Sequence, residues 1–321
     1  MKTPSFWYAN QSSIIETLLF PFAKIWGLET KRRLKKKGYK SSLPVICVGN
    51  VTIGGAGKTP TCINLGKYYQ SKGFRPAFLS RGYGAKITSP IKVDASKHHY
   101  NEVGDEPLLL SQYAPTWVCP NRADGAKAIE ESGEADIIIM DDGMQNPSLH
   151  KDYNILIIDG GFGLGNKKVI PAGPLREALS DNQRRVDIAM VIGDDIYHVA
   201  EDLEVSVVQG EIKAQREMIN KNEHYWAFCG LGRPSKFYET LRLEDIDVKA
   251  TFDFDDHHPY SEKDITDLIQ AAQLNECLLI TTEKDKMRIP AHLRDEICYL
   301  PIRVCVNFAT FEGLPLIEDD M

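Results

Sequence analysis

The sequence has no closely spaced cysteine pair and no long uninterrupted apolar run. Its seven cysteines are scattered singly over 321 residues. This pattern argues against a zinc or disulfide framework and predicts reduced thiols in a cytosolic compartment. No apolar stretch approaches the ~18 residues of a membrane-spanning helix. We also expect no cleavable signal peptide, because the early basic cluster follows the first apolar segment instead of preceding it.

Neither sign of charge is scarce, but the two signs are unevenly distributed. Residues 1–40 contain nine Lys or Arg and two Glu, whereas the rest of the chain has 29 basic and 43 acidic residues. An acidic body is a poor match for nucleic acid, so no nucleic-acid partner is expected. The basic N-terminal end therefore needs its own explanation.

Residues 13–28 place apolar and aromatic side chains at helical spacing, and a basic run at residues 31–37 follows directly. This arrangement suits an amphipathic helix in a membrane interface, with its cations over anionic headgroups. The alternative is a helix docked on the protein's own core, followed by a solvated charge run. The residues alone leave these two interpretations open.

Short apolar runs recur between helical stretches. They predict strands at residues 45–48, 77–79, 116–119, 136–140, 155–158, 188–192, 225–229 and 277–281. Such alternation is typical of an α/β fold with a doubly wound, mostly parallel sheet. A polar stretch at residues 210–224 is the expected seam between two domains.

The most informative segment is GNVTIGGAGKTP at residues 49–60, directly after the strand expected at 45–48. It contains the parts of a phosphate-binding loop, namely Gly54, Gly55, Gly57, Lys58 and Thr59. Glycine amides can surround phosphate oxygens, while Lys58 reaches the β/γ-phosphates and Thr59 holds Mg²⁺. The usual first glycine is replaced by Thr52. The alternative is an ordinary glycine-rich turn, but the combination favours nucleotide binding.

Two pairs of acids are candidates for the chemistry. Asp141 and Asp142 follow an apolar strand, and in a parallel sheet they would lie beside the phosphate loop, where carboxylates bind Mg²⁺. Asp105 and Glu106 stand on a turn before an apolar helix. Asp105 suits a catalytic carboxylate near the γ-phosphate, or equally a helix cap.

Residues 253–260 combine acids with two imidazoles. Adjacent side chains on an extended chain point apart, so only one of His257 and His258 would face a given site. Three arginines in Gly- or Pro-containing segments could bind ATP or an anionic substrate, namely Arg81, Arg122 and Arg176. Residues 281–285, TTEKD, close a strand and are expected to cap a helix, with a functional role as the weaker alternative.

Nine sequence blocks together resemble the tetraacyldisaccharide 4'-kinase (lipid A 4'-kinase) family. They run from about residue 44 to residue 288 as VGNVTIGGAGKTP, SRGYG, VGDEPLLL, DDGMQN, IDGGFGLGN, IPAGPLREAL, FCGLGRPSKF, FDDHHPYS and TTEKDKMR. The resemblance implies a P-loop NTPase-like fold and Mg²⁺-dependent transfer of the ATP γ-phosphate. The acceptor would be the 4'-hydroxyl of tetraacyldisaccharide 1-phosphate, a lipid A precursor.

The resemblance also implies an organisation in three parts. Residues 1–40 would bind the inner-membrane surface, residues 13–40 making the contact. Residues 41–215 would form the kinase core, and residues 216–321 a smaller α/β domain that closes the active-site cleft. The enzyme would be peripheral, on the cytoplasmic face of the inner membrane, and no obligate protein partner is expected.

The family's motifs assign roles to individual positions. Its phosphate loop covers Thr52, Ile53, Gly54, Gly55, Ala56, Gly57, Lys58 and Thr59. Its metal-associated groups correspond to Thr59, Asp141, Asp142 and, less directly, Glu106. Asp105 matches a catalytic carboxylate that acts with a histidine, for which His257 is preferred over His258. Which member of the pair takes the proton stays open, as does any contact of a family histidine replaced here by Asn146.

Two other functions compete with this interpretation. A membrane-associated P-loop ATPase switch would use the amphipathic helix as a nucleotide-regulated anchor and phosphorylate no lipid. A soluble small-metabolite kinase would use the same acids but leave the apolar face of residues 13–28 as part of its core. Removal of residues 1–40 distinguishes the soluble kinase, whose membrane independence would be unchanged.

Overall fold

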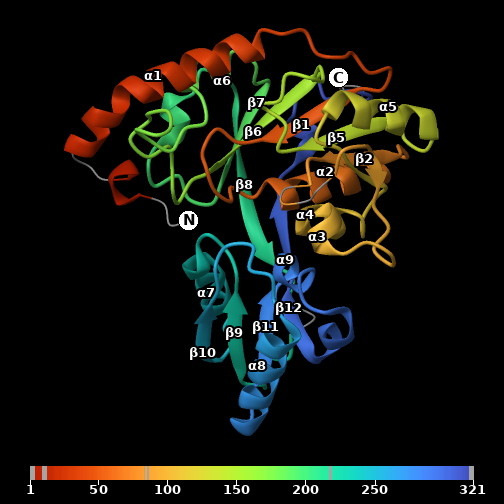
Figure 1. Cartoon of the computed structure of the whole chain (residues 1–321), viewed down its shortest axis with the longest axis vertical. Coiled ribbons are helices and arrows are strands. Elements are labelled where there is room, and N and C mark those ends of the chain that lie inside the picture. The colour runs from red at the N-terminus through yellow and green to blue at the C-terminus, as the bar shows by residue number, and fades with distance from the viewer. Residues whose placement is uncertain (1–3, 9–12, 83, 85–86, 217–218, 318–321) are drawn as a thin grey trace.

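The computed structural model describes residues 4–8, 13–82, 84, 87–216 and 219–317. These residues form a large part built on a nine-stranded sheet and a smaller part built on a four-stranded sheet (Figure 1). The small part lies below the large part in Figure 1, with α9 close to their junction. This arrangement confirms the predicted α/β fold with a mostly parallel main sheet.

The large sheet has the strand order β13-β8-β7-β6-β1-β5-β2-β4-β3. Its strands are β1 (Val45–Gly49), β2 (Pro76–Ser80), β3 (Ile91–Lys92), β4 (Thr116–Val118), β5 (Ile137–Asp141), β6 (Tyr153–Asp159), β7 (Ile188–Ile192), β8 (Val207–Ala214) and β13 (Ile302–Cys305). Only β3 and β13 run antiparallel to their neighbours. The central strand β1 pairs with β5 and β6, so the loop after it starts in the middle of the sheet.

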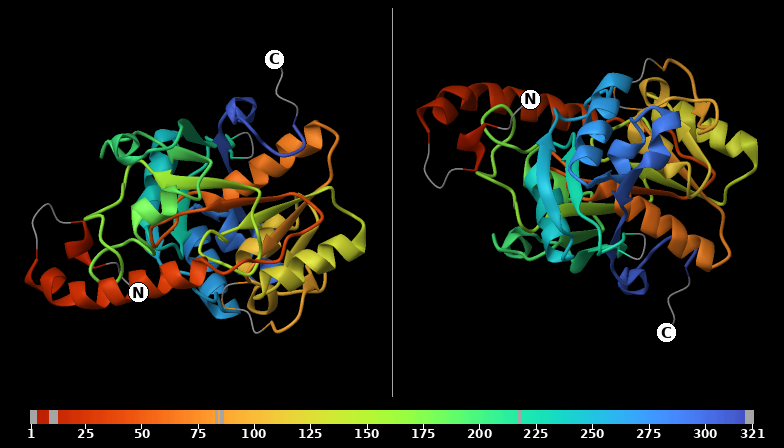
Figure 2. Two further views of the ribbon diagram at one scale, coloured as in Figure 1. Left: turned by 90° about the horizontal axis from the view of Figure 1, so that it is seen from above. Right: turned by 90° about the horizontal axis from the view of Figure 1, so that it is seen from below.

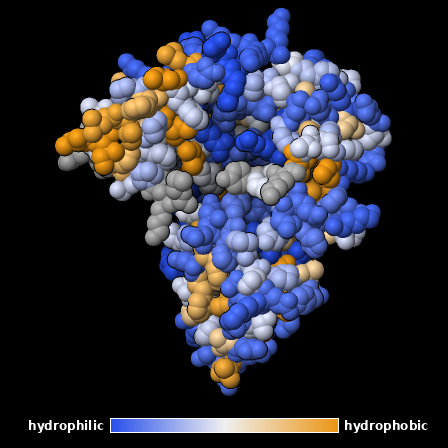
Figure 3. All heavy atoms as spheres, in the orientation of Figure 1, coloured by the Kyte–Doolittle hydropathy of each residue, from blue (hydrophilic) through white to orange (hydrophobic). Residues whose placement is uncertain are grey.

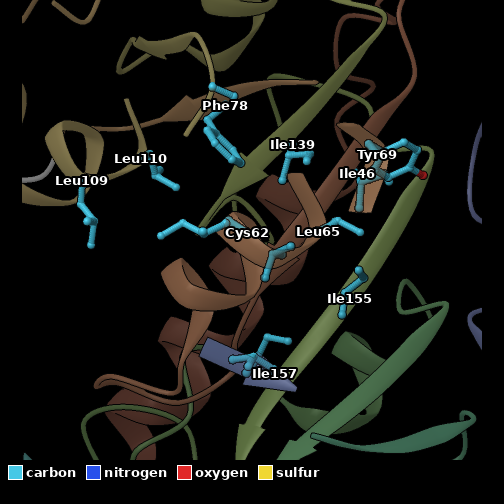
Figure 4. Packing of buried hydrophobic residues seen from close by; sticks show 14 of the residues in the cluster. Ile46, Cys62, Leu65, Tyr69, Phe78, Leu109, Leu110, Ile139, Ile155 and Ile157 are labelled. Carbon is cyan, nitrogen blue, oxygen red and sulfur yellow. The ribbon is translucent and has the colours of Figure 1, made fainter. Parts of the chain in front are cut away.

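Helices cover both faces of the large sheet, which explains why its central strands are apolar throughout. The helices are α2 (Lys58–Ser71), α3 (Tyr100–Val103), α4 (Asp105–Leu110), α5 (Arg122–Ser132) and α6 (Leu179–Gln183). Cys62 and Leu65 of α2 pack against Ile46 and Ile139 on one face (Figure 4). Ile129 of α5 belongs to the cluster on the opposite face.

The small part is a parallel sheet with the order β10-β9-β11-β12. Its strands are β9 (Tyr225–Cys229), β10 (Val248–Asp253), β11 (Leu278–Thr282) and β12 (Ile297–Leu300). Its helices are α7 (Pro234–Leu243), α8 (Glu262–Leu274) and the single turn α9 (Glu283–Lys286). Short 3₁₀ turns complete the fold at Ser5–Trp7, Val199–Asp202, Ala291–Glu296 and Phe308–Thr310.

Helix α1 (Ile14–Leu34) confirms the helix expected at residues 13–28 and continues into the basic run. It begins after Ser13, whose side chain accepts a hydrogen bond from the Ile15 amide. The helix lies along the outside of the large part (Figure 2). Its buried residues are Glu16, Ala23 and Thr30. No helix among the described residues combines the length and apolarity required to cross a bilayer.

Two features of the fold differ from the sequence-based expectation. The strands β3, β8, β10, β12 and β13 were not expected, because none is a fully buried apolar run. The polar seam expected at residues 210–224 begins inside β8, which belongs to the large sheet. The chain also returns to the large sheet as β13, and Phe308 and Phe311 join its core. Within the range 216–321 expected for the small domain, β13 and these two phenylalanines therefore pack with the large part.

Candidate active site

The glycine loop leaves the carboxyl end of β1 and leads into α2. Gly57 is the N-cap of α2 and has a φ of 90°, and Gly54 has a φ of 121°, both in a region that favours glycine. A Cβ atom on Gly54 or Gly55 would meet no atom within 4 Å, so the backbone there is open to a ligand. The amides and the helix N-terminus together form a site suited to phosphate.

Lys58, in the first turn of α2, lies near Asp142, which directly follows β5. Its Nζ lies 3.9 Å from Asp142 Oδ1, and Arg176 Nη1 donates a hydrogen bond of 2.7 Å to the same oxygen. Burial raises the pKa of Asp142, but Lys58 and Arg176 outweigh burial and leave it below its ordinary value. Asp142 is therefore a carboxylate held between two cations.

Asp141 lies in a different environment, although it is the adjacent residue. Its side chain is buried, and its Oδ2 atom has no hydrogen-bond partner among the described residues. Burial, together with the charge of Glu106, raises the pKa of Asp141 from 3.8 to about 7 in spite of Lys58. A buried carboxylate oxygen without a donor is a place where a cation fits. Thr59, also buried, lies one helical position after Lys58.

Asp105 and His257 meet across the two parts of the molecule. Asp105 begins α4 after Gly104, whose φ is 94°, and its Oδ1 accepts a 2.9 Å hydrogen bond from the Glu106 amide. His257 Nδ1 lies 3.0 Å from Asp105 Oδ2, although the residues are 152 positions apart. His257 has a φ of 57° in the turn after β10, and its amide donates to Gly230 O.

His258 points elsewhere. Its ring packs against Phe254 and Tyr260, and its Nε2 lies 3.6 Å from Asp264 Oδ2. Of the two adjacent histidines, the structure therefore brings only His257 to Asp105, as expected for neighbours whose side chains diverge.

Two further cations surround Asp105. Arg288 Nε lies 3.3 Å from Asp105 Oδ2, and Lys284 Nζ donates to Glu106 Oε1 over 2.9 Å. Burial raises the pKa of Asp105, but Lys284, His257 and Arg288 together hold it below its ordinary value. Asp105 is thus an ionised carboxylate in a buried setting, and it can accept a hydrogen bond from a hydroxyl held beside it.

The three arginines of the sequence analysis occupy different positions. Arg81 is exposed after β2, whereas Arg122 is the first residue of α5 and is buried, donating to Cys119 O over 2.7 Å. Arg176 binds Asp142 as described above. Asn146 accepts hydrogen bonds from Ser148 in a local turn.

Sequence reasoning missed several residues of this region. Lys284 was considered only within the TTEKD helix cap, and the structure does place a cap there, because Thr282 accepts a hydrogen bond from the Asp285 amide. Arg288 was not singled out, although it closes the TTEKDKMR block. Arg233, whose Nη2 donates to the phosphate-loop carbonyl of Gly55 over 3.3 Å, was also missed. Arg233 lies in the FCGLGRPSKF block, and this block is the sequence signal by which it could have been found.

A glycine loop leads from the central strand β1 into a lysine-bearing helix, and a carboxylate–histidine pair joins the two parts of the molecule. These features define a P-loop α/β protein of the phosphoryl-transfer class. Sequence comparison then specifies the family. The chain belongs to the tetraacyldisaccharide-1-P 4'-kinase family, whose model matches residues 15–314.

Curated relatives and a solved structure agree with this assignment. The tetraacyldisaccharide 4'-kinase of Methylobacterium nodulans is 41% identical over 300 residues, covering 91% of this chain and 88% of the relative. That of Paramagnetospirillum magneticum is 42% identical over 311 residues, covering 94% of each chain. The crystal structure of LpxK from Aquifex aeolicus in complex with ATP superposes with a TM-score of 0.70. It is 24% identical, covers 91% of this chain and 95% of that chain, and supports the fold.

Proposed function

We propose that this chain transfers the γ-phosphoryl group of ATP to the 4'-hydroxyl of tetraacyldisaccharide 1-phosphate, a step of lipid A synthesis. Membership of the 4'-kinase family supports this assignment. The observation that most directly supports phosphoryl transfer to a hydroxyl is the 3.0 Å contact between His257 Nδ1 and Asp105 Oδ2. This contact joins the small part, which contains His257, to the large part, which contains Asp105 and the phosphate loop.

In this proposal the ATP phosphates lie in the loop formed by residues 52–59. Their oxygens accept hydrogen bonds from the loop amides at Gly54, Gly55, Ala56 and Gly57, with Thr52 and Ile53 at the start of the loop. Lys58 contributes positive charge to the β/γ-phosphates. The open space around Gly54 and Gly55 supports this assignment.

The residues beside the loop fit Mg²⁺. Asp141 Oδ2 has no hydrogen-bond partner among the described residues and is a suitable ligand for a cation. Thr59, Asp142 and Glu106 are proposed to complete the site, directly or through water. Among the described residues no three His, Cys, Asp or Glu side chains converge on one cation position. Phosphate oxygens and water would then supply the remaining ligands. Bound Mg²⁺ would neutralise phosphate charge.

We assign proton removal to Asp105, which would accept the proton of the 4'-hydroxyl as this oxygen bonds to the γ-phosphorus. The bond from phosphorus to the bridging oxygen breaks, and its electron pair leaves with ADP. His257 is assigned a positioning role, since its Nδ1 fixes one oxygen of Asp105. Arg81 and Arg176 are proposed to contact anionic groups of the substrates, with the buried charge of Arg122 contributing at longer range.

We also propose that residues 13–40 hold the enzyme on the inner-membrane surface, on its cytoplasmic face. The apolar side of α1 faces solvent (Figure 3). Its exposed side chains are Ile14, Ile15, Leu18, Phe20, Phe22, Ile25, Trp26 and Leu28. The basic residues after Leu28 are exposed as well, although Lys31 pairs with Asp181 and Lys40 pairs with Asp152. An acceptor with four acyl chains remains in the bilayer, so the enzyme needs such a contact.

The active site would lie between a kinase core at residues 41–215 and the small part that follows it. Ion pairs and hydrogen bonds that join the two parts support a site at this junction. In this proposal, approach of the small part brings His257 to Asp105 and excludes water from the reacting groups.

The proposed function is tested by incubating Mg-ATP labelled in its γ-phosphate with tetraacyldisaccharide 1-phosphate in mixed micelles. The wild-type protein should label the lipid, and Lys58→Ala should lose at least 100-fold in transfer rate, because charge at the β/γ-phosphates is removed. ATP hydrolysis without labelled lipid would instead favour the membrane-associated ATPase switch. Wild-type transfer by Lys58→Ala would contradict the role of the loop.

A further inference from the structure

Lys284 extends from the small part toward the acids of the large part. It lies on the single-turn helix α9, and 23% of its side chain is exposed. Its Nζ donates a 2.9 Å hydrogen bond to Glu106, the residue that follows Asp105 on α4.

The position of Lys284 is fixed by a buried network at the adjacent residue. The Asp285 carboxylate is fully buried and accepts 2.8 Å hydrogen bonds from the Gly230 amide and the Tyr260 hydroxyl. Arg288 donates to the same carboxylate and also to the carbonyl of Gly230. Because this network fixes the turn, the backbone that carries Lys284 is not a mobile surface segment.

The charge of Lys284 acts on three carboxylates of the large part. It is the strongest of the cations that hold down the pKa of Asp105 against burial, and it also lowers the pKa of Asp141 against burial. The pKa of Lys284 itself is raised by Glu106 and Asp105, which outweigh burial. An ammonium cation therefore stands beside Asp105 and Glu106 and within electrostatic range of Asp141.

The following inference rests on the proposed function, in which the phosphoryl group moves from the phosphate loop to a hydroxyl beside Asp105. A group moving from the phosphate loop to a hydroxyl beside Asp105 has Lys58 on the loop side. The described contacts place Lys284 on the acceptor side, next to Glu106. Charge on the phosphoryl oxygens in the transition state is stabilised by cations fixed on both sides.

We propose that Lys284 is a further catalytic residue. With both substrates bound, its ammonium contacts a non-bridging oxygen of the γ-phosphoryl group while the bond to the 4'-oxygen forms and the bond to the ADP oxygen breaks. Glu106 holds the ammonium in place before the substrates bind. The lysine neutralises charge and neither gains nor loses a proton in the step.

Lys284→Met tests the proposal, with Lys286→Met as the matched control. Lys286 lies on the same turn, but its ammonium stacks over the Tyr299 ring, 4.0 Å from the ring centroid. Single-turnover transfer should fall about 100- to 1000-fold in Lys284→Met, with KM for ATP within about threefold of wild type. Lys286→Met should transfer at a rate within about threefold of wild type, and Lys284→Arg should recover part of the loss.

A binding measurement separates the phosphoryl contact from general damage. Affinity for ADP should be unchanged in Lys284→Met, because ADP lacks the γ-phosphoryl group. Affinity for ADP with orthovanadate, which occupies the position of that group, should fall about tenfold or more. Equal losses for the two probes, or none for either, would overturn the proposal.

A double variant addresses folding and the ion pair. Glu106→Gln with Lys284→Met removes both charges together, so neither is left unpaired in the folded protein. If Lys284 contacts the phosphoryl group, the double variant should be at least tenfold slower than Glu106→Gln alone. Equal rates would mean that the lysine acts only through Glu106. A wild-type protein that labels no lipid would refute the proposed function, whereas a fully active Lys284→Met would refute only this inference.

Discussion

Three aspartates of the site differ in charge behaviour because their surroundings differ. Burial raises the pKa of all three, but cations outweigh burial at Asp105 and Asp142 and fail to do so at Asp141. The first two are therefore ionised carboxylates, whereas Asp141 is poised to gain a cation. One residue type thus supplies two different properties within one site.

Asp141 makes the stability of the protein without nucleotide or metal depend on pH. The unfolded chain releases this proton near the ordinary value of 3.8, the folded chain only at about 7. Stability contributed by this group is therefore full below pH 4 and is lost as pH rises to about 7. Asp141→Asn should remove this loss and raise the free energy of unfolding at pH 8 by roughly 2–4 kcal/mol.

Urea denaturation of both proteins at pH 5 and pH 8 measures this effect. The difference between Asp141→Asn and wild type should be larger at pH 8. A difference that is equal at the two pH values would contradict the raised pKa.

Asp105→Asn should lower kcat about 100- to 10,000-fold, because the amide cannot accept the proton of the hydroxyl. KM for ATP should change little, since Asp105 lies on the acceptor side of the phosphate loop. The side chain does not cap α4 in the usual way, because the N-cap is Gly104 and no side-chain cap is present. Thermal unfolding of the variant is the control: a loss of folding comparable to the loss of activity would favour a structural role.

The sequence reveals some site residues directly and others only by resemblance. Lys58 is predictable because loop, lysine and helix start are contiguous and local physics determines their geometry. The partnership of Asp105 with His257 rests on residues 152 positions apart and was expected only from the family. No role could be assigned to Lys284 or Arg288 from the sequence. Their contacts with Glu106 and Asp105 form only when the small part packs against the large part.

At the scale of single elements, α1 has an unusual orientation. The helix is docked through polar contacts: Glu16, 2% exposed, pairs with Lys168 and accepts a hydrogen bond from Asn166. Trp26 Nε1 also donates to Arg176 O, which connects the helix to a loop of the active site. The larger apolar side chains are left outward, the reverse of a helix that packs on a protein core.

Replacing Leu18, Phe22 and Ile25 together by Ser should therefore weaken membrane binding without weakening the fold. These side chains are 68%, 61% and 66% exposed, so their removal leaves little cavity. Each contributes about 1 kcal/mol or more on insertion into an interface, so binding should fall at least 100-fold. Sedimentation with anionic phospholipid vesicles measures binding, and thermal unfolding provides the control. Unchanged vesicle binding would contradict the membrane role of α1.

The strands that could be predicted from the sequence are those that are buried along most of their length. Strands such as β1 and β7 are buried along their whole length, so an apolar run identifies them. The strand β8 has a half-exposed, mixed pattern, and β13 pairs with it at the edge of the sheet. An edge strand has one neighbour and fewer buried positions, so its sequence carries a weaker signal.

At the scale of the whole molecule, charged contacts join the two parts. Besides the contacts of Lys284 and His257, Arg233 near the start of α7 binds Asp159 at the end of β6. Its guanidinium stacks on Phe162, with its carbon 3.9 Å from the ring centroid. The same side chain reaches Gly55 O in the phosphate loop, so the small part contacts the nucleotide-binding region directly.

Arg233→Met should lower the free energy of unfolding by about 1–3 kcal/mol, because Asp159, 7% exposed, keeps only Lys236 as a cationic partner. Urea denaturation measures this loss. Asp159→Asn in the same background should recover part of it, because the unpaired charge is then removed. If the double variant is less stable than Arg233→Met, the buried carboxylate is not the source of the loss.

The division of the chain was the least predictable feature at this scale. The polar stretch at residues 210–224 runs from β8 of the large sheet to the start of β9 in the small sheet. Nothing in the local pattern of IRVC at β13 shows that the chain returns to the first sheet. Such a return depends on long-range strand pairing, which local sequence patterns do not encode.

The central claim is that the chain phosphorylates one hydroxyl of a membrane-held acceptor. The most direct measurement is transfer of labelled γ-phosphate from Mg-ATP to tetraacyldisaccharide 1-phosphate, beside the same acceptor lacking its 4'-hydroxyl. Label is expected on the intact acceptor at the 4' position and none on the other. Label on both acceptors, or ATP hydrolysis with no labelled lipid, would contradict this claim.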